Sequence, residues 1–562
     1  MIQTRRIDAW CAGWRGPLLA ALLALVAGLP GLIALPPLDR DEARFAEASA
    51  QMLESGDLVS PHFQDVPRFK KPVGVYWMQA LAVRATGSLE ERAIWAYRLP
   101  SILGAMIAAA ACAWGAAAFL RPGSALLAGG LLATTMLLST EADIAATDGA
   151  LCGAMTLAMA ALGRTYLAAR NGKPIKRRVK VAFWAAFAVA VLLKGPIAPL
   201  IVALTLISLC VWDRRIAWLK NLGWGWGLIL VAIVVGPWAV AITVATDGAF
   251  WGAAMGSDLA PKLTGDQEGH GAPPGFYLAL APLLLFPASV LLPTGLAAGW
   301  RDRAEPAIRF ALCWLIPTWL MFELIPTKLV HYPLPTYGAL AWLMAAAFEQ
   351  LIGPTARRAG AVVSALAAVV FAVAIPAAIH VLGYGGGTSS VWAALAAMLF
   401  LAAGLGGGYL FWRSRDLDAL AVGGIAGVLA HAVVIGLLAP GLKPLWLSVG
   451  VARALTEAGL SPRQGLVSGP VTVAGYQEPS LVFLLGADTV LGDAQDAAVA
   501  IGDRRPVVIE SRQDAAFKAA LAADGQTARP VARVDGLDYS NNQRDTLIIY
   551  RPTGRSRTES PP

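Results

Sequence analysis

A polar segment with acids at one end and a basic turn at the other is the part of the sequence best suited to chemistry. It runs from Leu38 to Pro72; Asp39, Asp41 and Glu42 open it, and Arg68, Lys70 and Lys71 close it. A carboxylate can take a proton from a hydroxyl acceptor as a general base, whereas Lys and Arg can neutralise a phosphate that is held or that leaves. A loop of this kind is either an exposed spacer or an active site.

The acids also carry a local structural signal. Asp39 is expected to cap a helix, with Glu42 three residues later as in a capping box. Asp41 then lies in the first turn, where the helix dipole keeps a carboxylate ionised and ready to accept a proton. The alternative is that the three acids only cap an interfacial helix.

Composition places this segment in a membrane protein. The 562 residues are 57% hydrophobic and only 15% charged, and the mean hydropathy is +0.59. Soluble domains carry about 25% charged residues, so we predict an integral membrane protein. The net charge of +8 is explained by Lys and Arg on cytoplasmic loops and does not indicate a nucleic-acid partner. The five cysteines have no CxxC spacing and predict neither disulfides nor a metal site.

About thirteen apolar runs are long enough to be transmembrane helices, which need about 20 residues. They lie near 16–35, 99–119, 125–141, 147–168, 180–193, 196–212, 223–246, 275–298, 308–325, 334–351, 360–382, 390–412 and 419–440. Arg and Lys concentrate at the N-terminus and in the connections after even-numbered spans, and such short basic loops stay in the cytoplasm. We therefore expect a cytoplasmic N-terminus, an outer loop at 36–98 and an outer C-terminal segment after about 442.

The C-terminal segment has a different pattern, typical of a small α/β domain. Its expected strands are 471–476, 506–510, 530–534 and 546–552, its expected helices are 478–485 and 511–523, and Asn541-Asn542 is the expected turn before the last strand. We predict a membrane catalytic domain at 1–445 that includes the first outer loop, a periplasmic domain at 446–552 and a disordered tail at 553–562.

Few other charges fall on the expected outer side. They are Glu141, Asp143 and Asp148, Lys194 in a KGP triplet, the loop 247–274 with His270, and Lys328, His331 and Tyr332 in PTKLVHYPLP. Ionisable groups kept at one membrane boundary indicate a site or merely snorkelling side chains. For Asp41, Asp148, Lys71 and Lys328 taken together we favour a site.

The donor for such a site is restricted by what the sequence lacks. It contains no GxGxxG, GxxxxGK[ST] or HExxH motif, which argues against a nucleotide sugar or ATP. A polyprenyl-phosphate sugar offers a phosphate leaving group, and its lipid tail needs a groove between membrane helices.

Three motifs resemble a known superfamily. D-E-A-R-F-A-E, M-L-E-S-G-D and R-F-K-K-P resemble the first outer loop of the GT-C glycosyltransferases, in particular the bacterial lipid A aminoarabinose transferases and the protein O-mannosyltransferase-like family. KGP at 194–196 and K-L-V-H-Y-P-L-P at 328–335 resemble two further motifs of that group. The resemblance implies a mainly α membrane protein with about thirteen transmembrane helices, outer juxtamembrane helices and a small C-terminal α/β domain.

The resemblance also implies residue roles. Asp41 matches the acid proposed to act on the acceptor, Glu42 is its partner, and Asp148 matches an acid of the second outer loop. The donor phosphate and substrate would be bound by Arg44, Lys71, Lys194, Lys328, Tyr332 and His270. Lys70 replaces the acid of the family's F-E-K-P motif, so no metal is assigned and no cofactor is required.

The sequence therefore predicts an inverting glycosyltransferase of the bacterial inner membrane. It would move a sugar from a polyprenyl-phosphate donor, such as undecaprenyl phosphate, to a lipid A, glycan or protein acceptor on the periplasmic face. The alternative is a transporter or flippase for a lipid-linked sugar, which would need charged residues near the midplane on broken helices. Here the charges cluster at one face, which favours the enzyme. A subunit with an inactive transferase domain is disfavoured by the presence of Asp41.

Overall fold

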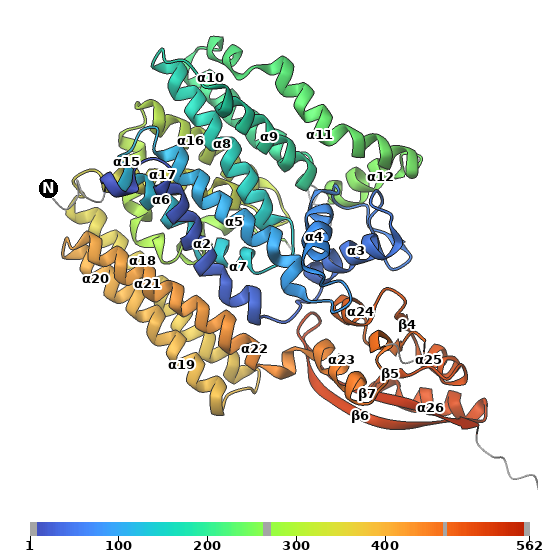
Figure 1. Cartoon of the computed structure of the whole chain (residues 1–562). Helices are drawn as coiled ribbons and strands as arrows, with labels where there is room; N and C mark the ends of the chain where they lie inside the picture. Colours follow the sequence, from blue (N-terminus) through green and yellow to red (C-terminus); the bar gives the residue numbers. More distant parts are fainter. Residues whose placement is uncertain (1–7, 262–270, 465–468, 556–562) are drawn as a thin grey trace, which may run out of the picture. The chain divides into compact units, whose positions relative to one another are not determined.

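Two compact units make up the chain. The computed structural model describes residues 8–261, 271–464 and 469–555 (Figure 1). The helical unit comprises Met1–Leu35, Phe69–Met78 and Arg98–Ala439, and the mixed unit comprises Pro36–Arg68, Gln79–Tyr97 and Pro440–Pro562. The polar segment is thus divided between Arg68 and Phe69, with Asp41 in the mixed unit and Lys71 in the helical unit.

A five-stranded sheet organises the mixed unit. Its order is β4 (Val490–Gly492), β3 (Thr472–Ala474), β5 (Val507–Glu510), β7 (Gln543–Arg555) and β6 (Gln526–Asp538). The first three strands are parallel, whereas β7 is antiparallel to both of its neighbours. The C-terminal sheet domain expected from the sequence is therefore present, and its last two strands form a hairpin that turns at the expected Asn541-Asn542.

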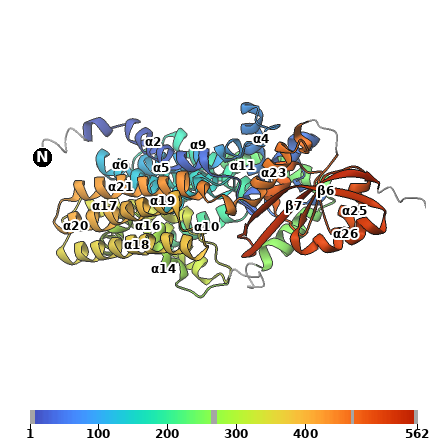
Figure 2. The ribbon, with the colours of Figure 1, turned by 90° about the horizontal axis from the view of Figure 1, so that it is seen from below.

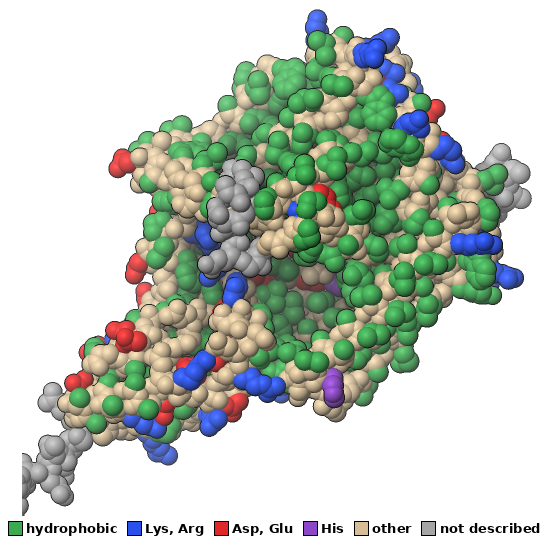
Figure 3. All heavy atoms as spheres, turned by 180° about the vertical axis from the view of Figure 1, so that it is seen from behind, with side chains coloured by type: hydrophobic (Ala, Val, Ile, Leu, Met, Phe, Trp, Pro, Cys, Tyr) green, Lys and Arg blue, Asp and Glu red, His purple; other side chains and the backbone are tan. Residues whose placement is uncertain are grey.

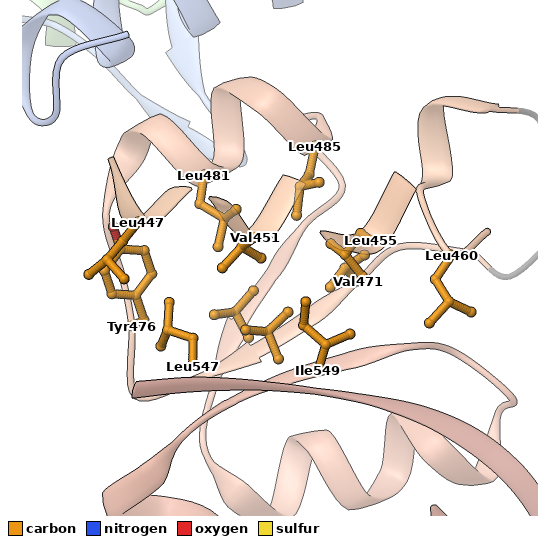
Figure 4. Close-up of a cluster of buried hydrophobic side chains, with 12 residues drawn as sticks. Leu447, Val451, Leu455, Leu460, Val471, Tyr476, Leu481, Leu485, Leu547 and Ile549 are labelled. Carbon is orange, nitrogen blue, oxygen red and sulfur yellow. The ribbon is translucent and has the colours of Figure 1, made fainter. Parts of the chain in front are cut away.

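Helices cover both faces of this sheet (Figure 2). On one face α23 (Leu447–Glu457) and α24 (Pro479–Leu485) direct Val451, Leu455 and Leu481 onto Ile549 of β7 (Figure 4). On the other face α25 (Ala494–Gly502) and α26 (Asp514–Ala523) pack around the buried Phe517. The sequence pattern missed β4, α23 and α25; α24 and α26 fall within the two expected helices.

Two parts of the first outer loop, Pro36–Arg68 and Gln79–Tyr97, belong to the mixed unit and fold onto these elements. They contain α3 (Asp41–Ser55), a short hairpin of β1 (His62–Phe63) and β2 (Val66–Pro67), and the second part of α4 (Gly74–Thr86). Within the unit, Gln64 Nε2 donates to the carbonyl of Ala487 at 3.1 Å, and Arg463 Nη2 donates to the carbonyl of Glu90 at 3.0 Å. The rings of Tyr97 and Phe483 lie 5.2 Å apart, edge to face. The loop is therefore held by side chains rather than left as a free spacer.

All thirteen intervals expected to span the membrane fall on helices. These are α2 (Arg15–Ala34), α5 (Ile94–Ala116), the bent pair α6 (Pro122–Ala133) and α7 (Met136–Ala142), α8 (Asp148–Arg170), α9 (Arg177–Lys194), α10 (Ile197–Asp213), α11 (Trp224–Ala245), the bent pair α14 (Phe276–Leu284) and η3–α15 (Ala288–Arg301), α16 (Pro306–Leu324), η4–α17 (Leu334–Phe348), α18 (Pro354–Val381), α19–α20 (Gly387–Trp412) and α21–α22 (Asp416–Gly441). Among the described residues, eight helices are long and apolar enough to cross a membrane alone, and ten spans result if each bent pair counts as one.

Burial shows which helices face lipid. In α11 and α18 only 11% and 22% of the apolar stretch is buried inside the protein. In α8 the buried share of the apolar stretch is 89%. An apolar helix that exposes most of its side chains is stable only where the solvent is itself apolar. Hydrophobic side chains cover much of the helical surface, with Lys and Arg toward its rim (Figure 3). The protein is thus a multi-pass membrane protein with α8 near the centre.

Glycines allow α8 to approach α5 closely. Gly149 and Gly153 lie one turn apart on α8, a spacing that favours close helix contact in membranes. A Cβ atom at Gly153 would lie 2.5 Å from the carbonyl oxygen and 2.9 Å from the Cα of Gly104 on α5. Both are backbone atoms, which cannot move aside as the end of a side chain could. This contact fixes α8, and with it Asp148 at its first position.

Replacing Gly153 with alanine is expected to force α5 and α8 apart and to lower the free energy of unfolding by about 1–3 kcal/mol. Thermal unfolding of the purified protein in detergent measures this. Gly236→Ala is the matched control, because a Cβ there meets nothing within 4 Å. Equal midpoints for the two variants would contradict the account of this contact.

Candidate active site

Four of the nine predicted site residues line one cavity of the helical unit. Lys71 lies in the turn before α4, Asp148 begins α8, Lys194 ends α9, and Tyr332 lies in the loop before α17. Together they surround about 150 Å³. Lys70 is the fourth charged residue of the lining, after Lys71, Asp148 and Lys194. Much of the remaining wall is apolar and includes Phe250, Trp251 and Met255 of α12 (Ala249–Gly252) and η2 (Ala253–Leu259), with Phe322 and Ile325 at the end of α16.

The residues that line the cavity carry more ammonium groups than carboxylates. Three ammonium groups, those of Lys70, Lys71 and Lys194, share the lining with one carboxylate, that of Asp148. An apolar wall screens charges poorly, so ammonium groups in the lining can interact strongly with an anion inside the cavity.

Asp148 and Lys194 form the tightest contact of the site. Lys194 Nζ lies 2.5 Å from Asp148 Oδ1, and Thr147 Oγ1 donates to Asp148 Oδ2 at 3.1 Å. Asp148 is the first residue of α8, where the helix dipole stabilises a carboxylate. The Lys194 ammonium also lies 5.4 Å from the centre of the Tyr332 ring. The pair therefore holds a cation beside the tyrosine.

The conformation of Gly195 sets the position of Lys194. Lys194 is the last residue of α9, and Gly195 ends the helix with φ 57° and ψ −119°, angles that residues with a Cβ rarely adopt. Pro196 follows and also lines the cavity. The KGP triplet thus ends one helix, starts the next and leaves the ammonium at the turn.

His331 is a site residue that the sequence reasoning noticed as a charge but did not assign. Its Nε2 lies 3.7 Å from Asp148 Oδ2 and its Nδ1 lies 3.5 Å from Glu141 Oε1. Burial acts to lower the pKa of His331, but the carboxylates of Asp148 and Glu141 outweigh it and raise that pKa above its ordinary value. The sequence feature that could have identified His331 as a site residue is its position next to Tyr332.

Glu141, Asp148 and His331 could together hold a divalent metal ion. Each offers one ligand atom, and these atoms lie within 4.8 Å of one another. Lys194 already places a positive charge 2.5 Å from the Asp148 carboxylate. A metal ion at this position would therefore compete with Lys194 for the same carboxylate.

Lys328 lies outside the cavity lining. Its ammonium donates to the carbonyls of Phe322 at 3.2 Å and Glu323 at 2.8 Å and also to that of Ile325, and the side chain is buried. These carbonyls are at the end of α16, where a cation is favourable. Lys328 thus closes a helix, while Tyr332 in the same motif reaches the cavity. His270 lies outside the described residues.

The remaining predicted residues are on α3 in the mixed unit. Asp41 begins this helix with its side chain 73% exposed, and Arg68 Nη2 lies 3.6 Å from its Oδ1. Glu42 is buried, and its Oε2 accepts a hydrogen bond from the Leu38 N–H at 2.8 Å. Arg44 is half-buried on the same helix. Asp41 is therefore the accessible carboxylate of the D-E pair, and Glu42 fixes the entry of the chain into α3.

The expected capping box with Asp39 is wrong. The N-cap position is Arg40, whose φ of 64° is rare for a residue with a side chain. The Asp39 carboxylate instead accepts a hydrogen bond from the Ser480 hydroxyl, and its N–H donates to Tyr539 Oη at 2.7 Å. Arg40 Nη2 donates to the carbonyl of Ser540 at 2.6 Å. The turn between β6 and β7 thus holds the backbone just before Asp41.

The contact between the β6–β7 turn and the residues before α3 includes carboxyl groups whose pKa is raised. Burial raises the pKa of Asp39. Burial, together with the carboxylates of Asp39 and Asp538, raises the pKa of Glu478 to about 7. An acid whose pKa is raised by folding contributes most stability below its unfolded pKa and loses that contribution as the pH rises through the folded value. The contact is therefore expected to loosen between about pH 4.5 and 7.

Removing the Tyr539 hydroxyl tests whether the hairpin turn orders the start of α3. Tyr539→Phe leaves the Asp39 N–H without its acceptor, a loss of about 1 kcal/mol. We expect amide hydrogen exchange in residues 39–44 to become about fivefold faster. Tyr550→Phe is the control, because it removes a hydroxyl bonded to Asp514 elsewhere in the same unit. Equal exchange in both variants would show that the turn does not order α3.

A family model and several known proteins are similar in sequence to part of this chain. Residues 37–250 match the family described as dolichyl-phosphate-mannose-protein mannosyltransferase (PMT). The undecaprenyl phosphate-alpha-4-amino-4-deoxy-L-arabinose arabinosyl transferase of Pseudomonas paraeruginosa PA7 is 31% identical over 332 residues, which cover 57% of this chain and 58% of that protein. The protein of the same name from Aeromonas salmonicida is 28% identical, covering 58% of this chain and 60% of that protein. The matches thus span less than two thirds of these relatives.

Solved structures extend the similarity to nearly the whole chain. ArnT from Cupriavidus metallidurans, in the crystal structure bound to undecaprenyl phosphate, matches with a TM-score of 0.76 at 20% identity and covers 94% of this chain and 97% of that one. The archaeal oligosaccharyltransferase AglB from Archaeoglobus fulgidus matches with a TM-score of 0.51 at 11% identity, over 97% of this chain and 74% of that one. The comparisons therefore agree with the resemblance seen in the sequence: residues 37–250 match the PMT family model, and the chain has the fold of ArnT.

Proposed function

We propose that this protein is an inverting glycosyltransferase that moves a sugar from a polyprenyl-phosphate donor to an acceptor on the periplasmic face of the inner membrane. The observation that carries the proposal is the cavity in which Lys70, Lys71 and Lys194 outnumber Asp148 and whose wall is largely apolar. A lipid phosphate has this combination of properties, an anionic head joined to an apolar chain. The names of the relatives, which describe transferases using undecaprenyl phosphate-linked aminoarabinose, support the donor class.

In this proposal the cavity binds the donor phosphate. Lys71 and Lys194 donate charge-assisted hydrogen bonds to its oxygens, and the Tyr332 hydroxyl adds a neutral one. Asp148 acts through Lys194, which it holds at 2.5 Å. As the bond between the anomeric carbon and the phosphate oxygen breaks, charge grows on the leaving phosphate, and fixed ammonium groups stabilise that charge.

Asp41 serves the acceptor. Its exposed carboxylate at the first turn of α3 takes the proton from the acceptor hydroxyl as the oxygen attacks the anomeric carbon. Attack from the face opposite the phosphate inverts the configuration at that carbon. Glu42 and Arg44 hold the surrounding helix and substrate rather than exchange the proton.

The proposal includes a membrane topology of thirteen spans. The eight to ten spans recognised by length and composition become thirteen when the basic helix α9 and the shorter apolar helices α10 and η4–α17 are counted. An odd number of spans puts the N-terminus and the C-terminal sheet domain on opposite sides of the membrane, and the basic loops favour a cytoplasmic N-terminus and a periplasmic sheet domain. The rival hypothesis, a flippase, finds no support in the names of the relatives.

In this proposal the acceptor is a hydroxyl of lipid A, of a glycan or of a protein. Lys70 lies in the cavity lining at the place where the resembling family has an acid. An additional cation there disfavours the cationic amino sugar that aminoarabinose provides, because like charges repel at short range. A neutral hexose or pentose fits the electrostatics better.

Asp41→Asn is expected to lower transfer by at least about a hundredfold, because the amide cannot accept the proton. Transfer of labelled sugar in membranes measures this, with protein level and membrane insertion checked by immunoblot. Asp65→Asn, at an exposed acid of the same loop, is the control and should keep wild-type activity. Full activity in Asp41→Asn would remove this residue from the proton transfer.

Lys71→Ala is expected to raise the KM for the donor about tenfold or more, since a charge-assisted contact to phosphate is lost. Lys71→Arg should restore part of the affinity, and Lys173→Ala, at an exposed lysine, should leave the KM unchanged. An unaltered donor KM in Lys71→Ala, together with normal protein level, would contradict the phosphate role.

A further inference from the structure

A second cavity of the helical unit is larger than the candidate active site and differently built. It has a volume of about 850 Å³ and lies among α2, α5, α6, α8 and the start of α9. Its lining includes Trp14, Ile107, Trp114 and Leu157, and two cations, Arg164 and Arg178. None of the described residues that line it is acidic.

The two cavities lie at opposite ends of α8. Asp148 begins this helix and Arg164 follows 16 positions later in the numbering, which corresponds to about 24 Å along the axis at 1.5 Å per residue. A distance of this size approaches the thickness of the hydrocarbon core of a bilayer, about 30 Å. The second cavity therefore opens at the membrane boundary opposite the candidate active site.

The two arginines of this cavity lack acidic partners. Arg164 is half-buried; its Nη1 donates to the carbonyl of Trp114, and its guanidinium lies 4.7 Å from the centre of the Trp114 ring. Arg178, exposed in the first turn of α9, is close enough to repel it. In the described part of the chain neither guanidinium lies within 4 Å of a carboxylate, whereas Arg92 and Arg309, which also face the interior, each have one.

Two guanidinium groups beside an apolar wall fit the chemistry of an anionic lipid. A guanidinium offers more donors than one carbonyl can accept, and two of them around one cavity suit the oxygens of a phosphate ester. The walls contributed by Ile107 and Leu157 suit acyl chains, and Trp14 and Trp114 have the amphipathic rings typical of the membrane interface. Basic cavities between transmembrane helices bind anionic lipid head groups.

We infer that this cavity is a binding site for an anionic glycerophospholipid of the leaflet opposite the candidate active site. The phosphodiester lies between Arg164 and Arg178, and an acyl chain follows the wall formed by α5 and α8. The lipid is a bound component of the fold and not the sugar donor.

Native mass spectrometry of the purified, delipidated full-length protein tests the inference. Titration with phosphatidylglycerol should show one tightly retained lipid, and phosphatidylcholine should bind about tenfold more weakly because its head group carries no net charge. The double variant Arg164→Gln/Arg178→Gln should lose the preference for phosphatidylglycerol. Arg177→Gln is the matched control: it removes an exposed arginine next to Arg178 that does not line the cavity.

A second variant separates loss of the site from loss of the fold. Leu157→Trp keeps both arginines but places a bulky ring on the wall proposed for the acyl chain, and should weaken retention of the lipid. Equal binding of the two lipids, or unchanged preference in the double variant, would overturn the inference. So would displacement of phosphatidylglycerol by glycerol 3-phosphate, which would indicate a soluble ligand, or tighter binding of undecaprenyl phosphate, which would indicate the donor.

Discussion

The contact between Lys194 and Asp148 is the interaction on which the candidate site depends. It joins the end of α9 to the beginning of α8 at 2.5 Å, beside the ring of Tyr332. A lysine and an aspartate so close in a largely apolar setting stabilise each other only if both are held in place, because taking each charge out of water is costly. The close approach of α8 to α5 at Gly153 fixes one partner, and the turn at Gly195 fixes the other.

The pair also explains why the site can attract an anion without a metal ion. Asp148 pairs with Lys194, and Lys70 and Lys71 are further cations of the lining. These two lysines lie just before α4, whereas Lys194 comes from a helix more than a hundred residues later in the chain. Cations from distant segments that meet in one cavity are a feature of sites that bind an anionic ligand.

Hydrophobic runs predicted the helices well because a membrane span depends on a local property, an uninterrupted apolar stretch. The same reasoning placed Asp148 and Lys194 at helix ends and recognised Lys71 and Tyr332, all of which line the cavity. It failed where the partner is distant in sequence. Ser480 and Tyr539 engage the backbone and carboxylate of Asp39, so Asp39 does not cap α3 as its local pattern predicted.

Lys328 and His331 illustrate the same limit within one motif. Both are charged residues of K-L-V-H-Y-P-L-P, and their spacing could not show that the first closes α16 while the second meets Asp148 and Glu141. Strand β4 was missed because its three residues give too short a pattern to recognise. Contacts made across the fold thus decided which of the predicted residues form the site.

The most direct test of the central claim is a structure of this protein with undecaprenyl phosphate bound, determined by cryo-electron microscopy in a lipid nanodisc. The account predicts the phosphate within hydrogen-bonding distance of Lys71 and Lys194, with Tyr332 beside it and the lipid chain leaving over the apolar wall. A phosphate bound elsewhere, with Lys194 still paired to Asp148 and the cavity empty, would contradict it.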